Sequence, residues 1–204
     1  GSAALIETVV TQSTVPVIET GAGVVHIFVD ASADPVSTAE IVHNAKVQRP
    51  SVCNSVETVL LHREALEGVL PGMVAKLLES GVTIHADDTV CALVPDAVAA
   101  TPEVWGREAL SLDISLKVVD SMDEALEHIH TYSTGHTESI LTSDSDNAER
   151  FVQEVDSAAV MVNASTRFTD GGEFGFGAEV GISTQKLHAR GPMGLPELTS
   201  TKWI

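Results

Sequence analysis

Residues 44–58, with the sequence NAKVQRPSVCNSVET, join a helical segment to a strand. The preceding residues 36–46 carry apolar side chains at helical spacing, and Pro50 marks a turn after them. The run that follows, 56–61, is rich in β-branched and aliphatic residues, which is typical of a buried strand. This helix–turn–strand pattern is a unit from which α/β folds are built.

Cys53 lies in this turn, between small polar residues and shortly after Lys46 and Arg49. Neighbouring cations favour the charged form of sulfur and lower the pKa of a thiol, so a reactive thiolate is one interpretation. A buried, inert cysteine is the other interpretation, and on composition alone it is the more common case.

Strands and helices alternate on both sides of the turn. Helices are predicted over 35–46, 64–80, 122–132 and 145–155; the second is expected to be interrupted by Pro71 and Gly72 and to stop at Gly81. Strands are predicted over 15–19, 24–30, 56–62, 82–86, 116–119, 139–142 and 160–163, the last of them buried, and 87–102 is a connection with one short helix. This succession predicts an α/β fold with a largely parallel sheet.

A glycine-rich polar loop, 164–177, follows the strand predicted over 160–163. Ligands of open parallel sheets collect at the carboxyl ends of the strands, so this loop is expected at a ligand-binding edge.

The composition narrows the classes of function and partner that the chain can have. The 204 residues suit one domain, and a formal net charge of −18 argues against nucleic acid or an anionic membrane as the main partner. No apolar run approaches the roughly 20 residues that span a bilayer. The two cysteines and eight histidines lack metal-ligand spacing, so no metal is expected, and a reducing cytoplasm is the simple location. The opening Gly1-Ser2 and the missing initiator Met suggest an excised piece of a longer protein.

Three stretches resemble a known enzyme family. Residues 44–58 closely resemble the catalytic cysteine segment of gamma-glutamyl phosphate reductases, also called glutamate-5-semialdehyde dehydrogenases. Residues 162–179, VNASTRFTDGGEFGFGAE, and 183–194, STQKLHARGPMG, resemble the same family. The family belongs to the aldehyde dehydrogenase superfamily. The resemblance therefore implies a three-layer α/β/α catalytic domain with a mostly parallel sheet.

The resemblance also implies a reaction and a domain division. The reaction is the NADPH-dependent reduction of L-glutamyl 5-phosphate to L-glutamate 5-semialdehyde, with phosphate release, in proline synthesis. Residues 1–30 are expected to form a strand–turn–strand link to a missing nucleotide-binding half, 31–183 the cysteine catalytic domain, and 184–204 a segment returning towards the missing half. NADP would then be bound mostly by segments absent from this chain, and the full-length protein is expected to be a homo-oligomer.

Within the resemblance, Cys53 is the expected nucleophile, and its own backbone N–H is an expected oxyanion donor. Lys46 and Arg49 are candidates to receive the leaving phosphate; for both, a solvated helix end is the alternative. Glu108 aligns with the superfamily glutamate that binds the nicotinamide ribose, although the residues after it depart from that pattern. Glu19 is expected to be a pocket neighbour and not an essential base.

Substrate binding is expected in the loop that follows Val162. Arg167 is the candidate for clamping the α-carboxylate, Ser165 and Thr166 offer further donors, and Asp170 could pair with the α-ammonium group. Two other readings stay open at this point. The chain could be a non-catalytic binding or assembly module, or a different acyl-phosphate or CoA-linked aldehyde dehydrogenase.

Overall fold

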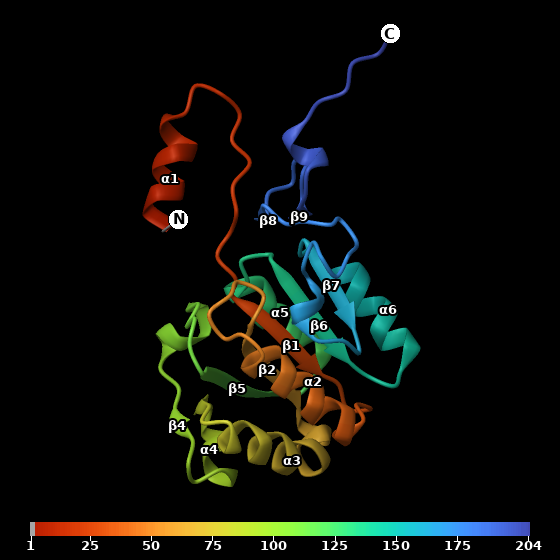
Figure 1. Cartoon of the computed structure of the whole chain (residues 1–204). Coiled ribbons are helices and arrows are strands. Elements are labelled where there is room, and N and C mark those ends of the chain that lie inside the picture. Colours follow the sequence, from red (N-terminus) through yellow and green to blue (C-terminus); the bar gives the residue numbers. More distant parts are fainter. Residues whose placement is uncertain (1–2) are drawn as a thin grey trace.

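Seven parallel strands form the centre of the computed structural model, which describes residues 3–204 (Figure 1). Their order across the sheet is β4-β3-β5-β2-β1-β6-β7, and every neighbouring pair runs parallel. The strands are β1 (Val25–Val29), β2 (Val56–His62), β3 (Thr83–Ala86), β4 (Val98–Ala99), β5 (Asp113–Val119), β6 (Thr137–Leu141) and β7 (Ala159–Val162). A separate antiparallel ribbon pairs β8 (Gly181–Ser183) with β9 (Gly191–Met193).

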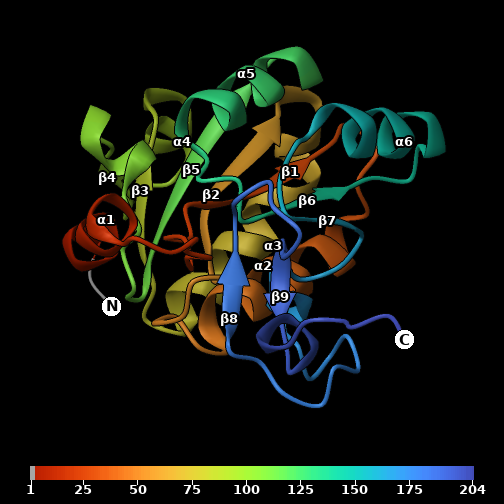
Figure 2. The ribbon, with the colours of Figure 1, turned by 90° about the horizontal axis from the view of Figure 1, so that it is seen from above.

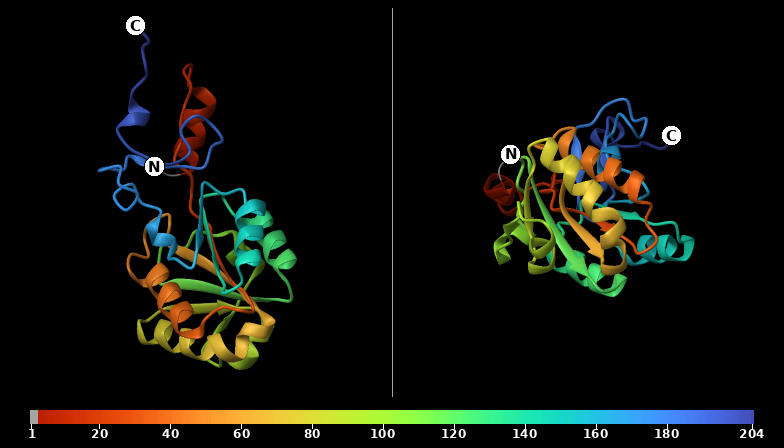
Figure 3. Two further views of the ribbon diagram at one scale, coloured as in Figure 1. Left: turned by 90° about the vertical axis from the view of Figure 1, so that its right-hand side faces the viewer. Right: turned by 90° about the horizontal axis from the view of Figure 1, so that it is seen from below.

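Helices cover both faces of the sheet (Figures 2 and 3). The α-helices are α1 (Ala3–Gln12), α2 (Pro35–Val47), α3 (Leu66–Glu79), α4 (Asp88–Leu93), α5 (Met122–Tyr132) and α6 (Ser145–Glu154), and the 3-10 helices are η1 (Arg63–Ala65), η2 (Pro102–Gly106), η3 (Thr166–Phe168) and η4 (Pro196–Leu198). One apolar core joins the sheet to α2, α3 and α4, and a second core joins its other face to α5 and α6. The predicted three-layer α/β/α fold with a parallel sheet is confirmed.

The alternation of side chains along β1 shows why two cores form. Ile27 and Val29 belong to the core beneath α2 and α3. Phe28 points to the opposite face, where its ring lies 6.2 Å from that of Phe151 on α6. Successive residues of a strand face opposite sides, so a continuous apolar run supplies both cores.

Local signals fix the helix that leads to Cys53. The Asp34 side chain accepts the backbone N–H of Ser37 at 2.8 Å, and Pro35 occupies the first helical position. The helix ends at Val47, directly before the turn. Prediction and structure agree here because capping and periodicity are properties of neighbouring residues.

Several predicted elements are wrong. Residues 15–19 do not form a strand; the backbone N–H of Glu19 bonds to the Gln185 side chain instead of to another strand's backbone. The helix predicted to be interrupted at Pro71 runs through it as α3. Strand β7 lies at the sheet edge and is only partly buried. Helix α1 and the β8–β9 ribbon were not predicted, and the domain division 1–30, 31–183 and 184–204 stays a prediction, its Gly1 and Ser2 lying outside the described residues.

Cys53 lies at the amino ends of the strands, because it directly precedes β2. Gly23 precedes β1 and Glu108 precedes β5, so both belong to the same edge. The sequence predicted only the loop after β7 at the carboxyl ends and gave no edge for Cys53, which lies at the opposite one. Helix α1 and the segment after β9 rise from this side of the sheet (Figure 1). Among residues 3–204, no helix has both the length and the apolar character needed to cross a membrane.

Candidate active site

Hydrogen bonds within the turn that carries Cys53, and the packing of Gly23 against it, hold the turn in place. Ser55 donates its backbone N–H to Val52 at 3.0 Å and its hydroxyl to the Ala45 carbonyl at 3.3 Å. Gly23 packs on the backbone of Cys53 so closely that a Cβ there would stand 1.6 Å from the Cys53 carbonyl oxygen. Only glycine permits this approach.

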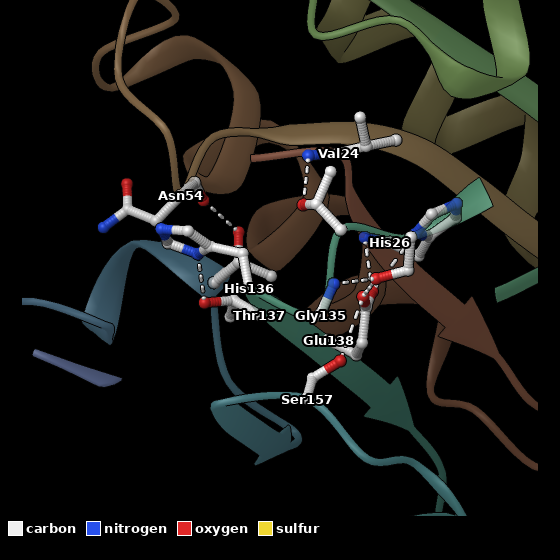
Figure 4. A network of polar contacts seen from close by, with 11 residues as sticks. Val24, His26, Asn54, Gly135, His136, Thr137, Glu138 and Ser157 are labelled. Atoms are coloured by element: carbon white, nitrogen blue, oxygen red, sulfur yellow. Dashed lines mark hydrogen bonds and ion pairs between the residues drawn. The ribbon is translucent and has the colours of Figure 1, made fainter. Parts of the chain in front are cut away.

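A polar network fixes the start of β1, next to Gly23 (Figure 4). The Glu138 Oε2 atom accepts the backbone N–H of His26 at 2.7 Å and lies 3.2 Å from His26 Nδ1. Its Oε1 atom accepts the hydroxyl groups of Ser133 and Ser157. His26 and Glu138 are fully buried, so this network is a rigid base for the residues before β1.

The loop after β7 folds back along α2 and binds the cysteine turn. The Thr166 hydroxyl donates to the Asn54 carbonyl at 2.8 Å, and the Asn54 side-chain amide donates to the Thr169 carbonyl at 2.7 Å. All three residues are buried. Two segments more than 100 positions apart thus meet at Asn54, the residue after Cys53. The loop makes this contact at the amino ends of the strands although it leaves the sheet at the carboxyl end of β7.

The pKa of the Cys53 thiol is raised, not lowered. Burial is the main cause, and the carboxylates of Glu179 and Glu108 add to it. The residue's own backbone N–H and the Arg167 guanidinium act in the opposite direction. The thiol therefore needs a proton acceptor or a bound cation before it becomes a nucleophile.

Lys46 does not face the thiol. Its Nζ atom is fully buried, 3.2 Å from Glu57 Oε2. The prediction that Lys46 lowers the thiol pKa is wrong, because the side chain points into the core of the domain beside Ala45, on the buried face of α2.

Two carboxylates stand near the sulfur. Glu108 accepts the backbone N–H of Gly23 at 2.8 Å, and Glu179 accepts that of Gly171 at 2.9 Å. The sequence prediction included Glu108 but missed Glu179. The only sequence signal for Glu179 is its position just after the glycine-rich loop. That position does not reveal that the chain returns to the cysteine there.

The guanidinium groups of Arg49 and Arg167 lie near each other, on the side of the domain that carries Cys53. Arg167 donates from Nε to the Gln48 side chain at 3.0 Å. Burial lowers its pKa, and the nearby Arg49 lowers it further. Arg49 is exposed, and within residues 3–204 its guanidinium has no hydrogen-bond or ion-pair partner. Arg49 and Arg167 thus offer donors to an anion.

The other predicted substrate residues are engaged within the protein. The Ser165 hydroxyl accepts the backbone N–H of Arg167 at 3.3 Å, and the Thr166 hydroxyl bonds to Asn54. Both residues are buried. Their predicted substrate contacts stay predictions, as do the substrate contacts of Arg49 and Arg167 and the cofactor contact of Glu108. Glu19 is half-buried and is not among the groups that shift the Cys53 pKa. No cluster of potential metal ligands occurs in the described part of the chain.

These groups together match one type of chemistry. A half-buried thiol, an N–H beside its sulfur, two acceptors for its proton and two cations are the components for displacing an anionic leaving group from an acyl carbon.

Known proteins resemble this chain at the level of sequence. No protein-family model matches it. All 204 residues align with the gamma-glutamyl phosphate reductase of Leifsonia xyli subsp. xyli at 67% identity, covering 48% of that protein, and with that of Thermobifida fusca at 60%, covering 49%. The chain therefore spans about half the length of the curated relatives that it matches.

Solved structures resemble its fold. The crystal structure of gamma-glutamyl phosphate reductase from Thermotoga maritima matches 99% of this chain and 49% of its own, with a TM-score of 0.95 and 54% identity. An acetylating aldehyde dehydrogenase from Geobacillus thermoglucosidasius matches the whole chain and 56% of its own with a TM-score of 0.75 and only 16% identity, so that likeness concerns the fold alone.

Proposed function

The chain belongs to the gamma-glutamyl phosphate reductase family, and we propose that it performs the nucleophilic part of that enzyme's reaction. The reaction is the reduction of L-glutamyl 5-phosphate to L-glutamate 5-semialdehyde with release of phosphate, in proline biosynthesis. One observation carries the proposal. Hydrogen bonds through Asn54 bind the Cys53 turn to the segment that bears Arg167, which brings thiol and guanidinium into one site.

The first step is acyl transfer to Cys53. A bond forms between the sulfur and the acyl carbon, the bond from that carbon to the phosphate oxygen breaks, and phosphate leaves with the bonding electrons. The thiol proton passes to Glu179 or Glu108, the carboxylates whose charge acts on the sulfur. The Cys53 backbone N–H supports the oxyanion, and Arg49 attracts the leaving phosphate.

Arg167 suits the far end of the substrate. It is close enough to the thiol to affect its pKa, and it also lines a surface cavity of about 480 Å³ between α2 and the loop after β7. Glu40 and Glu173 line the same cavity. An α-amino acid group carries one anion and one cation, which matches this mixture of charges; Asp170, whose charge acts on Arg167, is a further partner for the ammonium.

The nicotinamide cofactor fits this chain only in part. Glu108 offers a carboxylate beside the thiol, which suits a ribose hydroxyl, but no G-x-G-x-x-G sequence is present to hold a pyrophosphate. When bound, the reduced nicotinamide supplies the hydride that turns the thioester into the aldehyde and restores the thiol. NADPH as the specific donor, a homo-oligomeric full-length protein and a cytoplasmic location remain proposals.

Acyl transfer can be tested without the cofactor. The chain carrying Cys91→Ser is incubated with L-glutamyl 5-phosphate, generated in place from glutamate and ATP by a glutamate kinase. We expect intact-mass spectrometry to find one added glutamyl group at Cys53, removable by hydroxylamine, and one phosphate released per chain. The additional change Cys53→Ala should abolish both signals. A folded chain that gains no acyl group at Cys53 contradicts the proposal.

Acetyl phosphate supplies a matched control for Arg167. It has the same leaving group but no α-carboxylate. Arg167→Met should slow acylation by glutamyl phosphate about tenfold more than acylation by acetyl phosphate, since a hydrogen bond to a charged group is lost only with the first donor. The loss of the guanidinium charge near the thiol acts on both donors alike. Equal loss with both donors would contradict the assignment of Arg167 to the α-carboxylate.

A further inference from the structure

A buried ion pair lies beneath the cysteine turn and takes no part in the proposed reaction. Lys46 Nζ stands 3.2 Å from Glu57 Oε2, and the side chains are 0% and 4% exposed. Desolvation of two charges opposes their attraction, so such a pair contributes little to stability compared with apolar residues of the same shape. Its presence calls for another explanation.

The pair joins the two ends of the cysteine turn. Lys46 is in the last turn of α2, and Glu57 is the second residue of β2, so Cys53 lies in the loop between them. The bond from the Ser55 hydroxyl to the Ala45 carbonyl lies beside the pair and closes the same loop.

The pair also reaches the segment that carries Glu108. The backbone N–H groups of Ala109 and Leu110 face the Glu57 carboxyl and favour its ionised form, whereas burial raises its pKa to about 7. Leu110 has a φ of +55°, a left-handed conformation that side chains other than glycine rarely adopt. Asp113, at the start of β5, acts on Lys46 from the same segment. The 109–113 backbone is thus held in an unusual shape against the pair.

These contacts form a closed path around the thiol. From the pair, the path runs through the 109–110 backbone to the Glu108 carboxylate, which accepts the Gly23 N–H. Gly23 packs on Cys53, and the cysteine turn returns to the pair. We propose that Lys46 and Glu57 are positioning residues that hold the Glu108 carboxylate against the Cys53 thiol. Neither residue touches the sulfur, so their effect on it passes through Glu108.

A double-mutant cycle tests this inference. Four forms are compared in a Cys91→Ser background: the parent, Glu108→Gln, Lys46→Met/Glu57→Leu, and all three changes together. The readout is the pH midpoint for alkylation of Cys53 by iodoacetamide. Because Glu108 raises the thiol pKa, Glu108→Gln should move the midpoint to lower pH. Lys46→Met/Glu57→Leu should also move the midpoint to lower pH. The triple variant should have the same midpoint as Glu108→Gln alone, because both changes remove the same effect, that of the Glu108 carboxylate on the thiol.

The outcomes separate positioning from a merely structural role. The apolar replacement should keep the thermal midpoint of unfolding close to the parent's while it moves the alkylation midpoint. The exposed pair Arg63–Asp120, which lies beyond the carboxyl ends of β2 and β5, is the matched control: Arg63→Gln/Asp120→Asn should move neither midpoint. An unchanged alkylation midpoint in the pair variant, or additive shifts in the triple variant, would overturn the inference.

One further variant keeps the test decisive. Should the apolar pair not fold, Glu57→Gln replaces it, because its amide oxygen still faces the 109–110 backbone, and the variant should give a smaller shift in the same direction. No shift in Glu57→Gln would then count against the inference. The readout needs neither acyl phosphate nor cofactor, so its result is independent of the proposed reaction.

Discussion

The two edges of the parallel sheet are built in opposite ways. At the carboxyl ends, the Asp30 carboxylate accepts bonds from Ser32 and Thr142 at 2.7 Å and from the Asn147 amide at 3.1 Å. Asn163 pairs with both backbone groups of Thr142 at 2.9 Å. Burial raises the pKa of Asp30, but these hydrogen bonds outweigh it and the net pKa is lowered. The polar side chains of Asp30 and Asn163 at this edge are thus held by hydrogen bonds.

The amino ends leave many polar atoms without partners. Within residues 3–204, most buried side-chain atoms lacking a hydrogen bond lie at this edge or in the loop that returns to it: His26 Nε2, Asn54 Oδ1, Glu57 Oε1, Thr58 Oγ1, His128 Nε2, His136 Nε2 and Thr169 Oγ1; Thr38 Oγ1, at the start of α2, is the exception. The raised pKa values of Cys53 and Glu57 belong to the same edge. Unsatisfied buried groups are costly and concentrate at functional sites. The contrast therefore assigns stability to one edge and chemistry to the other.

The largest expected effect comes from Gly23→Ala. The added Cβ would overlap the Cys53 carbonyl, so β1 and the cysteine turn cannot keep their places. We expect a loss of about 3 kcal/mol or more in the free energy of unfolding, together with loss of the parent alkylation profile at Cys53. Urea unfolding measures the free energy, and the pH dependence of iodoacetamide alkylation measures the profile at Cys53. Gly72→Ala, which meets nothing within 4 Å on helix α3, should be neutral or stabilising by up to about 1 kcal/mol.

Asp30→Ala should separate stability from reactivity. It removes a charged acceptor from three side chains at the carboxyl edge. We expect the free energy of unfolding to fall by about 2 kcal/mol, while the pH profile of Cys53 alkylation stays as in the parent. A changed profile would mean that the two edges are coupled, which would break the comparison.

A pH-dependent effect is expected from His136, a buried histidine at the amino edge. Burial lowers its pKa to about 4, so the folded protein holds it neutral while the unfolded chain protonates it below about 6.5. Stability should therefore fall as the pH decreases from 6.5 to 4, and His136→Gln should remove about one proton from those taken up on unfolding in this range. Urea unfolding at several pH values measures this dependence of the free energy of unfolding on pH. An unchanged pH slope would contradict the assignment.

Much of the fold follows from local sequence, whereas the surroundings of the thiol do not. The caps at Asp34 and Ser121 and the apolar run of β2 mark their elements with neighbouring residues alone. The β-branched residues 15–19 show the limit of such reasoning, because a strand needs a partner that sequence cannot supply. Cys53 was found through resemblance, which carries long-range information that periodicity lacks.

The misassigned lysine shows the same limit. Lys46 is close to Cys53 in sequence, yet its side chain enters the core and neutralises Glu57. The groups that raise the thiol pKa, Glu108 and Glu179, come from segments far along the chain. Charge near a cysteine in sequence therefore predicts its pKa only when the side chains also meet in space.

The most direct test of this account is the thiol pKa of Cys53 itself. It is measured by the pH dependence of iodoacetamide alkylation in the Cys91→Ser chain, folded and in urea. The account predicts a higher pKa in the folded chain than in the unfolded one, and a lower folded value after Glu179→Gln. A folded pKa at or below the unfolded one would contradict it, because that result would mean that nearby cations, and not burial and two carboxylates, control the sulfur.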